Sequence, residues 1–496
     1  MKSITEEKRE IPVVAEPDVL VVGAGPAGIG AAIAAARNGA NTLLIERYGF
    51  IGGNLTIAMV NPMFTFHDTN GRQVIKGIAG EVVDRLVELK LSEGHVTDLT
   101  FDNASMTPFD PEGMKILLLR MVKESGAHLL LHTQVVGAIR KEGRVETVII
   151  ESKSGRQAIS PKYVIDCSAD ADIVAKIGAP FVLGRREDGM MQPVTLFFRI
   201  GGINNETMRS WMKGHRSLLK DSPEDSEIDG QDAIAFLGMK ELIKEAMEKG
   251  EFPKDAAPRI LFYQLPQKDQ VAVNVTRLQG IDGTNVNDLT RAELETREQA
   301  WGVHQFLKKQ VGGFEDSYVL DTGIQVGVRE TRHIVGDYEL TEDDVLSGAS
   351  FDDGIACGTF AIDIHPPKGE QQIFSGSGKK VYEIPYRCLL PRELDNLWVA
   401  GRCISATHAA FGSARVMATS MAIGQGAGTA AAYAQIHRLN SRQVDVEAIR
   451  KLLVRQGQYL LNEQINDEIN EKLILKRTDG SGDKGGHYNP FKDREG

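Results

Sequence analysis

The chain has 496 residues, of which 42% are hydrophobic and 25% are charged, and its formal net charge is −11 at pH 7. This length excludes a small single module and predicts two or three structural units. The acidic balance argues against a nucleic-acid partner, because phosphate neutralisation needs a basic stripe. No apolar run approaches the ~18 residues of a membrane span. The first ten residues are charged throughout and lack a signal core, so we expect a cytoplasmic protein with no membrane partner.

The first predicted elements are a strand, a GxGxxG turn, an alanine-rich helix ending at Gly39, and a second strand, Leu43–Glu46. The glycines permit a tight turn, close approach of a pyrophosphate to the backbone, and close strand–helix packing. The positive N-terminal end of the helix favours phosphate. Glu46 follows the glycine motif by ~20 residues, the spacing at which an acidic side chain accepts hydrogen bonds from a ribose. The pattern predicts a dinucleotide site, with a glycine turn lacking a ligand as the alternative. The predicted contacts are Gly23, Gly25, Pro26, Ala27, Gly28 and Glu46.

The following elements change from helix to strand. Asp110 and Pro111 predict the start of a helix over 114–124, and strands are expected at 128–139, 145–152 and 162–167. Beyond residue 190 we expect strands at 259–265 and 271–277. A helix with a capping box is expected from Thr290. This change of pattern predicts an inserted domain before the chain rejoins the nucleotide fold around 386–421.

Two features favour FAD over NAD as the dinucleotide. Gly52 and Gly53 follow Glu46, and residues 396–402 read as a distant strand ending at Gly401 and Arg402. A FAD fold commonly returns near its C-terminus to contact the flavin end, whereas a nicotinamide dehydrogenase completes its site in one continuous domain. No second GxGxxG opens a helix in mid-chain, so a built-in NAD(P)H domain is not expected.

Residues 407–417 precede a predicted alanine- and glycine-rich helix that runs to about residue 432, and the start of this helix is the candidate flavin-facing element. Its positive N-terminal dipole would favour the negative charge of reduced flavin. Gly412 would allow close approach to the ring, and Ser413 would cap the helix. A packing helix relieved by glycines is the alternative.

Four segments together resemble the FAD-dependent oxidoreductase family of the FAD_oxidored type, which is related in its cofactor domain to fumarate reductase flavoproteins. They are the N-terminal motif, residues 164–172, residues 327–332, and residues 400–408 continuing to Gly428. The resemblance covers roughly residues 17–436. It implies FAD as cofactor and adds further cofactor contacts to the glycines of the first motif: Arg47, Gly52, Gly53, Asn54, Val136, Ala169, Gly401, Arg402, Gly412, Ser413 and Ala414.

The expected fold is α/β, with a Rossmann-like FAD-binding domain of the glutathione reductase/fumarate reductase type and an inserted α+β substrate or cap domain. The FAD-binding domain is expected over 17–190 and 383–438, and the inserted domain over 191–382. A helical segment is expected at 439–478, and a disordered tail at 479–496.

The catalytic candidates are cationic side chains that can bind an anionic substrate or move a proton. Arginine binds carboxylates with two parallel hydrogen bonds, and histidine titrates near neutral pH. A structural ion pair, such as one between Glu330 and a neighbouring arginine, is the alternative for each arginine, and a structural role is the alternative for each histidine. The candidates are Arg329, Arg332, His365, His408 and Arg415, with His333 in the same cluster.

Other reactive groups carry less information. His67 and Asp68 are candidates for covalent flavin attachment, with a loop position as the alternative. Cys167, Cys357, Cys388 and Cys403 are widely spaced with no CxxC pair, which argues against a disulfide reductase, an iron–sulfur cluster and a zinc site. We expect buried free thiols and no metal.

The combined prediction is an FAD-dependent oxidoreductase that transfers a hydride between a small polar substrate and flavin N5. A flavoprotein with a non-redox, structural or partner-dependent role is the alternative, and a flavin monooxygenase is a third. The substrate, the direction of reaction, the external electron donor or acceptor, and the formation of a homo-oligomer stay open.

Overall fold

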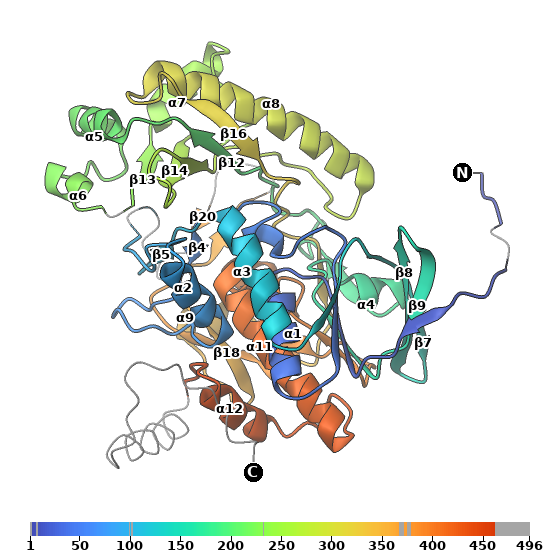
Figure 1. Ribbon diagram of the computed structural model, residues 1–496. Helices are drawn as coiled ribbons and strands as arrows, with labels where there is room; N and C mark the ends of the chain where they lie inside the picture. Colours follow the sequence, from blue (N-terminus) through green and yellow to red (C-terminus); the bar gives the residue numbers. More distant parts are fainter. Residues whose placement is uncertain are drawn as a thin grey trace, which may run out of the picture.

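A computed structural model describes residues 2–5, 8–98, 100, 103–231, 233–366, 372–373 and 378–461. The tail expected at 479–496 lies outside the described residues, as does the 462–478 part of the expected C-terminal helical segment. In its described part this segment holds one helix, α12 (Val446–Arg455). The fold is mixed α/β (Figure 1).

A parallel sheet at the centre of the molecule carries the GxGxxG turn. Its strands are fully buried except at one edge, so they read as apolar runs without alternation. The C-terminal strand pairs with residues 164–166, which brings two distant parts of the chain together. The strand order is β22 (Leu397–Val399), β10 (Tyr163–Asp166), β2 (Val19–Val22), β3 (Thr42–Ile45) and β6 (His128–Leu130).

Helices α1 (Pro26–Arg37) and α11 (Met417–His437) cross in close contact beside this sheet (Figure 1). A Cβ atom at Gly424 would lie 1.9 Å from the Ala27 carbonyl oxygen, and one at Gly428 would lie 2.1 Å from that of Ala31. The glycines at 424 and 428 therefore serve helix packing, and they hold the N-terminal end of α11 near the GxGxxG turn.

A second sheet, of mostly antiparallel strands, lies beside α4 (Asp172–Lys176) (Figure 1). The strands expected at 145–152 and 162–167 are present, whereas the one expected over 128–139 divides into β6 and β7. Strand β9 was not expected. The order is β1 (Val13–Ala15), β9 (Gly155–Ile159), β8 (Arg144–Ser152) and β7 (Gln134–Lys141).

A third sheet, with antiparallel pairing throughout, lies at the opposite end of the molecule from α12 (Figure 1). Residues between 198 and 314 form a separate hydrophobic core there. The order is β13 (Ala235–Gly238), β14 (Ile260–Gln264), β15 (Val271–Val273), β12 (Phe198–Gly201) and β16 (Tyr318–Thr322). Its helices are α5 (Asn205–Gly214), α6 (Asp225–Asp229), α7 (Lys240–Glu248) and α8 (Val286–Gln310).

The remaining elements pack mainly around a larger hydrophobic core, which includes residues of α1 and α11 and residues between 340 and 364. The strand pairs are β4 (Met63–Phe64) with β5 (Met106–Thr107), β11 (Phe181–Leu183) with β17 (Arg332–Ile334), β18 (Gly354–Gly358) with β21 (Tyr382–Pro385), and β19 (Asp363–Ile364) with β20 (Gln372–Ile373). The helices are α2 (Ile78–Glu88), α3 (Pro111–Glu124), α9 (Glu342–Ser347) and α10 (His408–Ala414).

Two expected helix caps are wrong. Helix α8 begins at Val286 with Asn285 as its N-cap, and Thr290 lies one turn inside, where its hydroxyl donates to the Val286 carbonyl. Ser413 does not cap α11, which begins after Val416 without a side-chain cap. Ser413 lies inside α10, whose cap is Thr407, because Thr407 Oγ1 accepts a hydrogen bond from the Ala410 amide. At the start of α8 several residues of capping type lie close together, and packing of the helix selects one of them.

Within the described ranges, no helix is long and apolar enough to cross a membrane. The same part of the chain has no cluster of three or more His, Cys, Asp or Glu residues suited to a metal ion. The four cysteines are buried free thiols, and burial raises the pKa of each.

Candidate functional site

A groove of about 370 Å³ runs along the carboxyl ends of the parallel strands. In open α/β sheets this edge is where ligands bind. The groove is lined by the GxGxxG turn, the end of β3, residues 133–135 before and in β7, residues 167–172 after β10, residues 400–402 after β22, and the first turn of α11. Parts of the chain as distant as Gly23 and Ser420 thus form one continuous wall.

The glycine turn leaves space for a ligand. Gly23 has a φ of 92°, which favours glycine. A Cβ atom at Gly25 would contact only the Gly53 Cα atom, at 4.0 Å, so a larger side chain there would fill the groove. No side chain caps α1 at this end. Its first amides are therefore available to an anion such as a pyrophosphate.

Glu46 lies at the end of β3 and is nearly buried. Its Oε2 accepts a hydrogen bond of 2.8 Å from the Ala24 amide, and its Oε1 accepts one of 3.1 Å from the Tyr48 amide. Burial raises the pKa of this carboxyl above its ordinary value despite those amides. A carboxylate has about four lone-pair sites, so Glu46 retains acceptors for ribose hydroxyls.

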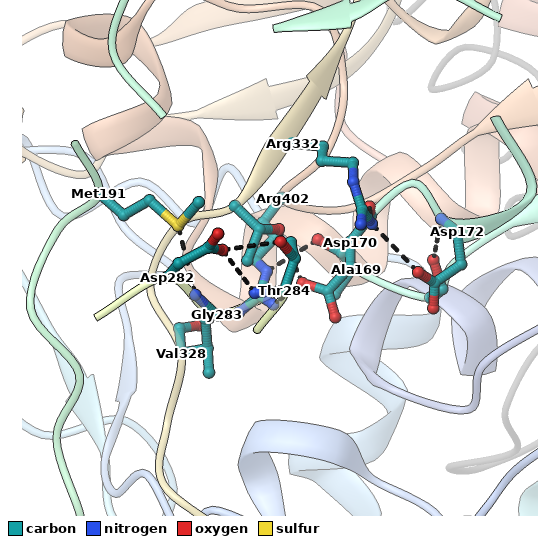
Figure 2. A network of polar contacts seen from close by, with 12 residues as sticks. Ala169, Asp170, Asp172, Met191, Asp282, Gly283, Thr284, Val328, Arg332 and Arg402 are labelled. Carbon is teal, nitrogen blue, oxygen red and sulfur yellow. Dashed lines mark hydrogen bonds and ion pairs between the residues drawn. The ribbon is translucent and has the colours of Figure 1, made fainter. Parts of the chain in front are cut away.

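Arg402 links three segments at the inner end of the groove (Figure 2). Its Nε donates to the Ala169 carbonyl at 2.8 Å, and its Nη atoms donate to the Val328 carbonyl and to Asp170. The side chain therefore holds the end of β22 against residues 169–170 and the segment that carries Arg329.

A second cavity, of about 140 Å³, adjoins the groove. The residues that line both spaces are Asn54, Val328, Arg402, Arg415 and Met417. Further walls come from the third sheet and from residues 360–365, so the cavity lies between the parallel sheet and the third sheet. Its charged lining residues are Arg259, Arg329, Asp363, Arg402 and Arg415.

Arg329 is one of the cations that line this cavity. Its Nη1 donates to the Pro193 carbonyl and to Thr195 Oγ1, both at 2.7 Å, and its Nε and Nη2 hydrogen-bond to nothing among the described residues. Burial, together with the charge of Arg415, lowers the pKa of the Arg329 guanidinium to about 9. Arg329 thus stays protonated at neutral pH and has donors left for an anion.

Asp363 and His365 form a hydrogen-bonded pair in the same cavity. Their side chains meet through His365 Nε2 and Asp363 Oδ2, which are 3.1 Å apart. Burial, and then the charge of Arg329, lowers the pKa of His365 to about 3. The imidazole is therefore neutral near pH 7. Because a carboxylate only accepts hydrogen bonds, Nε2 carries the hydrogen, and Nδ1 keeps the lone pair of a base.

Arg415 lies beside this pair, between α10 and α11. Its Nη2 donates to the Asp363 carbonyl at 3.2 Å, and its Nε is buried with no hydrogen-bond partner among the described residues. Burial lowers the pKa of the Arg415 guanidinium. An unsatisfied buried donor on the wall shared by groove and cavity fits contact with a bound ligand.

His408 lies behind the cavity wall, on a buried carboxylate. Glu330 Oε1 is 2.7 Å from His408 Nδ1 and 3.1 Å from His333 Nε2, and Glu330 Oε2 accepts from the Gln192 amide at 3.0 Å. Burial acts in the opposite direction, but the two histidines lower the pKa of Glu330 to about 2. Neither His408 nor Glu330 lines any of the three described cavities.

The family model of FAD dependent oxidoreductases matches residues 18–453, which includes every element that lines the groove. The chain belongs to this family. FAD is therefore the dinucleotide assigned to the groove. The expected relationship at family level is confirmed.

Curated relatives match this chain over about a third of its length. The chain is 30% identical over 173 residues to a thiamine thiazole synthase from Methanococcus vannielii, covering 33% of this chain and 60% of that protein. It is 32% identical over 158 residues to a digeranylgeranylglycerophospholipid reductase from Methanocaldococcus jannaschii, covering 30% and 37%. The chain thus spans 60% and 37% of these relatives' lengths, less than two thirds in each case.

Solved flavoenzyme structures are similar at low identity. L-proline dehydrogenase from P. horikoshii aligns with a TM-score of 0.43 and 14% identity over 90% of this chain and 100% of that chain. A geranylgeranyl bacteriochlorophyll reductase-like protein from Thermoplasma acidophilum aligns with a TM-score of 0.41 and 14% identity over 93% and 84%. These TM-scores identify no substrate.

Most of the expected FAD contacts line the groove. The GxGxxG amides would hold the pyrophosphate, Glu46 the ribose, residues 133–135 the adenine end, and Gly401, Arg402 and Met417 the flavin end. Expected residues that line it are Gly23, Gly25, Pro26, Ala27, Glu46, Arg47, Gly53, Asn54, Ala169, Gly401 and Arg402.

The other expected contacts do not line the groove. Gly28 lies against the Gly23 carbonyl, and the Gly52 amide donates to Ala24. Val135 lines the groove and Val136 does not. Gly412 packs on Asp363, and Ser413 hydrogen-bonds to Tyr382, so α10 holds residues 412–414 in the protein interior.

Residues 412–414, which were expected to face the flavin, therefore line neither the groove nor the adjoining cavity. Arg415, Val416 and Met417 reach the groove or the cavity at the point where the unexpected helix α10 ends and α11 begins. No capping signal in the sequence marks the division, since α11 starts after Val416 without a side-chain cap.

Two further candidates lie elsewhere. Arg332 donates to the Asp170 carbonyl at 2.9 Å and to Asp172 at 3.2 Å, and it lines none of the three described cavities (Figure 2). His67 is hydrogen-bonded to Ser105 at 3.0 Å and also lines none of them. Neither position supports a role for these residues in substrate binding or in covalent flavin attachment.

Proposed function

We propose that this enzyme exchanges a hydride between flavin N5 and a small substrate that carries a carboxylate. The observation that supports the proposal is the cavity beside the groove, where the Arg329 guanidinium has donors left for a ligand. Among the described residues that line this cavity, Asp363 is the only one with a carboxylate. Residues 191–382 supply much of this wall, in keeping with a substrate domain over that range.

The substrate carboxylate would bind to Arg329 and Arg415. A planar guanidinium matches a carboxylate with two parallel hydrogen bonds, and burial strengthens the attraction. Val328, Phe64 and Phe360 exclude water from the same space. These contacts would orient the substrate carbon that exchanges the hydride.

FAD, when bound, supplies the ring that accepts or donates the hydride. In the oxidative direction a substrate C–H bond breaks and the hydride leaves with both electrons, while a proton from the substrate's hydroxyl or amine passes to His365 Nδ1. Asp363 holds the imidazole in the tautomer that accepts this proton. In the reductive direction the same proton returns to the product.

Anaerobic reduction of the holoenzyme tests this proposal. Mixing with a panel of small 2-hydroxy and 2-amino carboxylates should bleach the flavin absorbance, whereas the matched amides or polyols should not. Bleaching only by uncharged compounds would contradict a carboxylate substrate. Flavin that is reduced only after a second electron-transfer protein is added would favour the partner-dependent alternative, and stoichiometric incorporation of oxygen would favour a monooxygenase.

The pH dependence of the reaction tests the role of His365. Because the pKa of His365 is lowered to about 3, the base is already unprotonated well below the ordinary histidine pKa of 6.5. We therefore expect kcat/KM to show no loss from His365 protonation between about pH 5 and pH 8, and to decline only as the pH falls toward its lowered pKa. An acidic limb near pH 6.5 that is absent in His365→Asn would contradict this assignment.

A further inference from the structure

We propose that the substrate side chain is a single aromatic ring, which packs against an aromatic wall formed by Phe64, Phe197, Tyr263 and Phe360. This inference rests on the proposed function, because it names the side chain of the same carboxylate substrate. The expected substrate class is thus a 2-hydroxy or 2-amino carboxylic acid with a side chain of the size of a phenyl ring.

The aromatic wall belongs to one cavity alone. The cavity beside the groove, called the substrate cavity from here on, adjoins a third cavity of about 100 Å³ as well as the groove. The four residues of the aromatic wall line the substrate cavity and neither of the other two spaces. The residues that line both the substrate cavity and the third cavity are Thr195, Arg259, Asn274, Arg329 and His365.

The cations of the substrate cavity lie where it meets its neighbours. Arg402 and Arg415 also line the groove, and Arg259 and Arg329 also line the third cavity. A carboxylate held by Arg329 and Arg415 would therefore lie at these junctions. The side chain of the substrate would extend from there toward the aromatic wall, so charge and apolar surface are separated within one cavity.

Phe197 and Phe360 are buried, yet they belong to none of the hydrophobic cores that the described residues form. Phe198, the neighbour of Phe197, lies in the core of the third sheet. The backbone at Phe360 is anchored, because Ser413 Oγ donates to its carbonyl at 2.5 Å and the Tyr382 hydroxyl is 2.7 Å from Ser413 Oγ. The wall is thus held in place before a ligand binds, which lowers the entropic cost of binding.

The rings of the wall are arranged as aromatic clusters prefer. The Phe64 centroid lies 6.0 Å from that of Tyr263 with an interplanar angle of 68°, and 5.9 Å from that of Phe360 with an angle of 45°. Aromatic pairs at such distances favour tilted and edge-to-face contacts over parallel stacking. A ring on the ligand extends this cluster with the same geometry, which favours an aromatic side chain over an aliphatic one of equal size.

Polar side chains in the same part of the cavity are hydrogen-bonded within the protein. Asn61 Nδ2 donates to the Phe109 carbonyl at 2.7 Å, and Asn61 Oδ1 accepts from the Phe109 amide at 3.4 Å. The Tyr263 hydroxyl is 3.1 Å from Thr100 Oγ1. These contacts hold the polar groups on the protein, so the ring of Tyr263 is the part that suits an apolar ligand.

The size of the substrate cavity limits the side chain to one ring. An apolar cavity of roughly 150 Å³ is known to hold one benzene molecule. The substrate cavity has a volume of about 140 Å³, and it continues into the groove and the third cavity at the end where the carboxylate would bind. A phenyl group therefore fits, whereas a fused two-ring system is too large.

The test is a binding titration of the holoenzyme with ligands that cannot be oxidised, followed by perturbation of the flavin absorbance. The ligands are acetate, phenylacetate, cyclohexylacetate, phenylacetamide and 2-naphthylacetate. We expect phenylacetate to bind at least about tenfold more tightly than acetate, because its ring is removed from water. Cyclohexylacetate and 2-naphthylacetate should each bind several-fold more weakly than phenylacetate.

Phe360→Ala then locates the ring. This change should raise the Kd of phenylacetate about tenfold and leave that of acetate within twofold. It should also lower the Kd of 2-naphthylacetate, because the shortened side chain makes room for the second ring. This gain shows that the variant is folded, and Phe360→Leu gives a smaller change in the same direction.

Trp301→Ala is the matched control for a lost aromatic side chain. Trp301 lies in α8, is 59% exposed and lines none of the three cavities, so every Kd should stay unchanged. Equal affinities of wild type for phenylacetate and acetate, or for phenylacetate and cyclohexylacetate, would overturn the inference. So would a Phe360→Ala enzyme with the wild-type preference among the ligands.

The outcomes separate this inference from the proposed function. Phenylacetamide that binds as tightly as phenylacetate, or the absence of flavin reduction by any carboxylate, would overturn the proposed function. The preference for a ring and its dependence on Phe360 would still be measured by the titration, because that readout requires no hydride transfer.

Discussion

Replacement of Arg329 by glutamine should lower kcat/KM for a carboxylate substrate by about 10³-fold, because truncating one partner of a buried, hydrogen-bonded charge pair costs 2–5 kcal/mol or more. The Nη1 bonds to Pro193 and Thr195 hold the guanidinium in place, and Nε and Nη2 remain for the substrate. Stopped-flow flavin reduction measures the loss. Flavin content, measured in parallel, shows that the cofactor is retained.

Two further variants sharpen the Arg329 experiment. Arg329→Lys keeps the charge but removes the planar pair of donors, so a partial loss is expected. Arg85→Gln is the control, because Arg85 pairs with Glu81 and Glu124 and lines none of the described cavities. An Arg329→Gln enzyme that retains kcat/KM within threefold of the wild type would refute the assignment of Arg329 as the carboxylate anchor.

Substitution of Gly424 by alanine should destabilise the protein and deplete its FAD. The added Cβ would lie 1.9 Å from the Ala27 carbonyl oxygen, so α1 and α11 must separate. Overpacking of this kind costs about 3 kcal/mol, and we expect a fall in Tm of about 5 °C. Because Ala27 and Met417 line the groove from these two helices, the ratio of flavin to protein absorbance should fall with it.

Gly80→Ala is the matched control for Gly424→Ala. Gly80 lies within α2, and a Cβ there would meet only the Gln73 side chain, at an ordinary 3.6 Å. Alanine should therefore be neutral, or stabilising by up to about 1 kcal/mol through its helix propensity. Unchanged flavin content in Gly424→Ala would show that the α1–α11 crossing does not position the cofactor.

Local motifs were the predictable part of the site. The GxGxxG turn, the helix after it and Glu46 lie within 29 consecutive residues, from 18 to 46, so short-range periodicity and glycine chemistry are enough to place them. The strand at Leu397–Val399 and its Gly401 were predictable for the same reason.

The catalytic candidates show where sequence reasoning stops. Arg329 and Arg332 are equally suitable in composition and lie three residues apart. On an extended chain, residues at that spacing face opposite sides, so Arg329 enters the cavity while Arg332 pairs with Asp172. Arg259 was not predicted at all, because an isolated cation in a domain with many surface charges carries no local signal.

The sequence alone therefore determined the cofactor class and the elements that hold its phosphates, since those depend on backbone conformation over short stretches. Tertiary structure decided which charged side chains meet. Arg259, Arg329, Asp363 and Arg415 come from separate segments, and only the packing of the third sheet against the parallel sheet brings them to one cavity. The selection is physical, because buried charge is tolerated only where hydrogen bonds, opposite charges or a ligand compensate it.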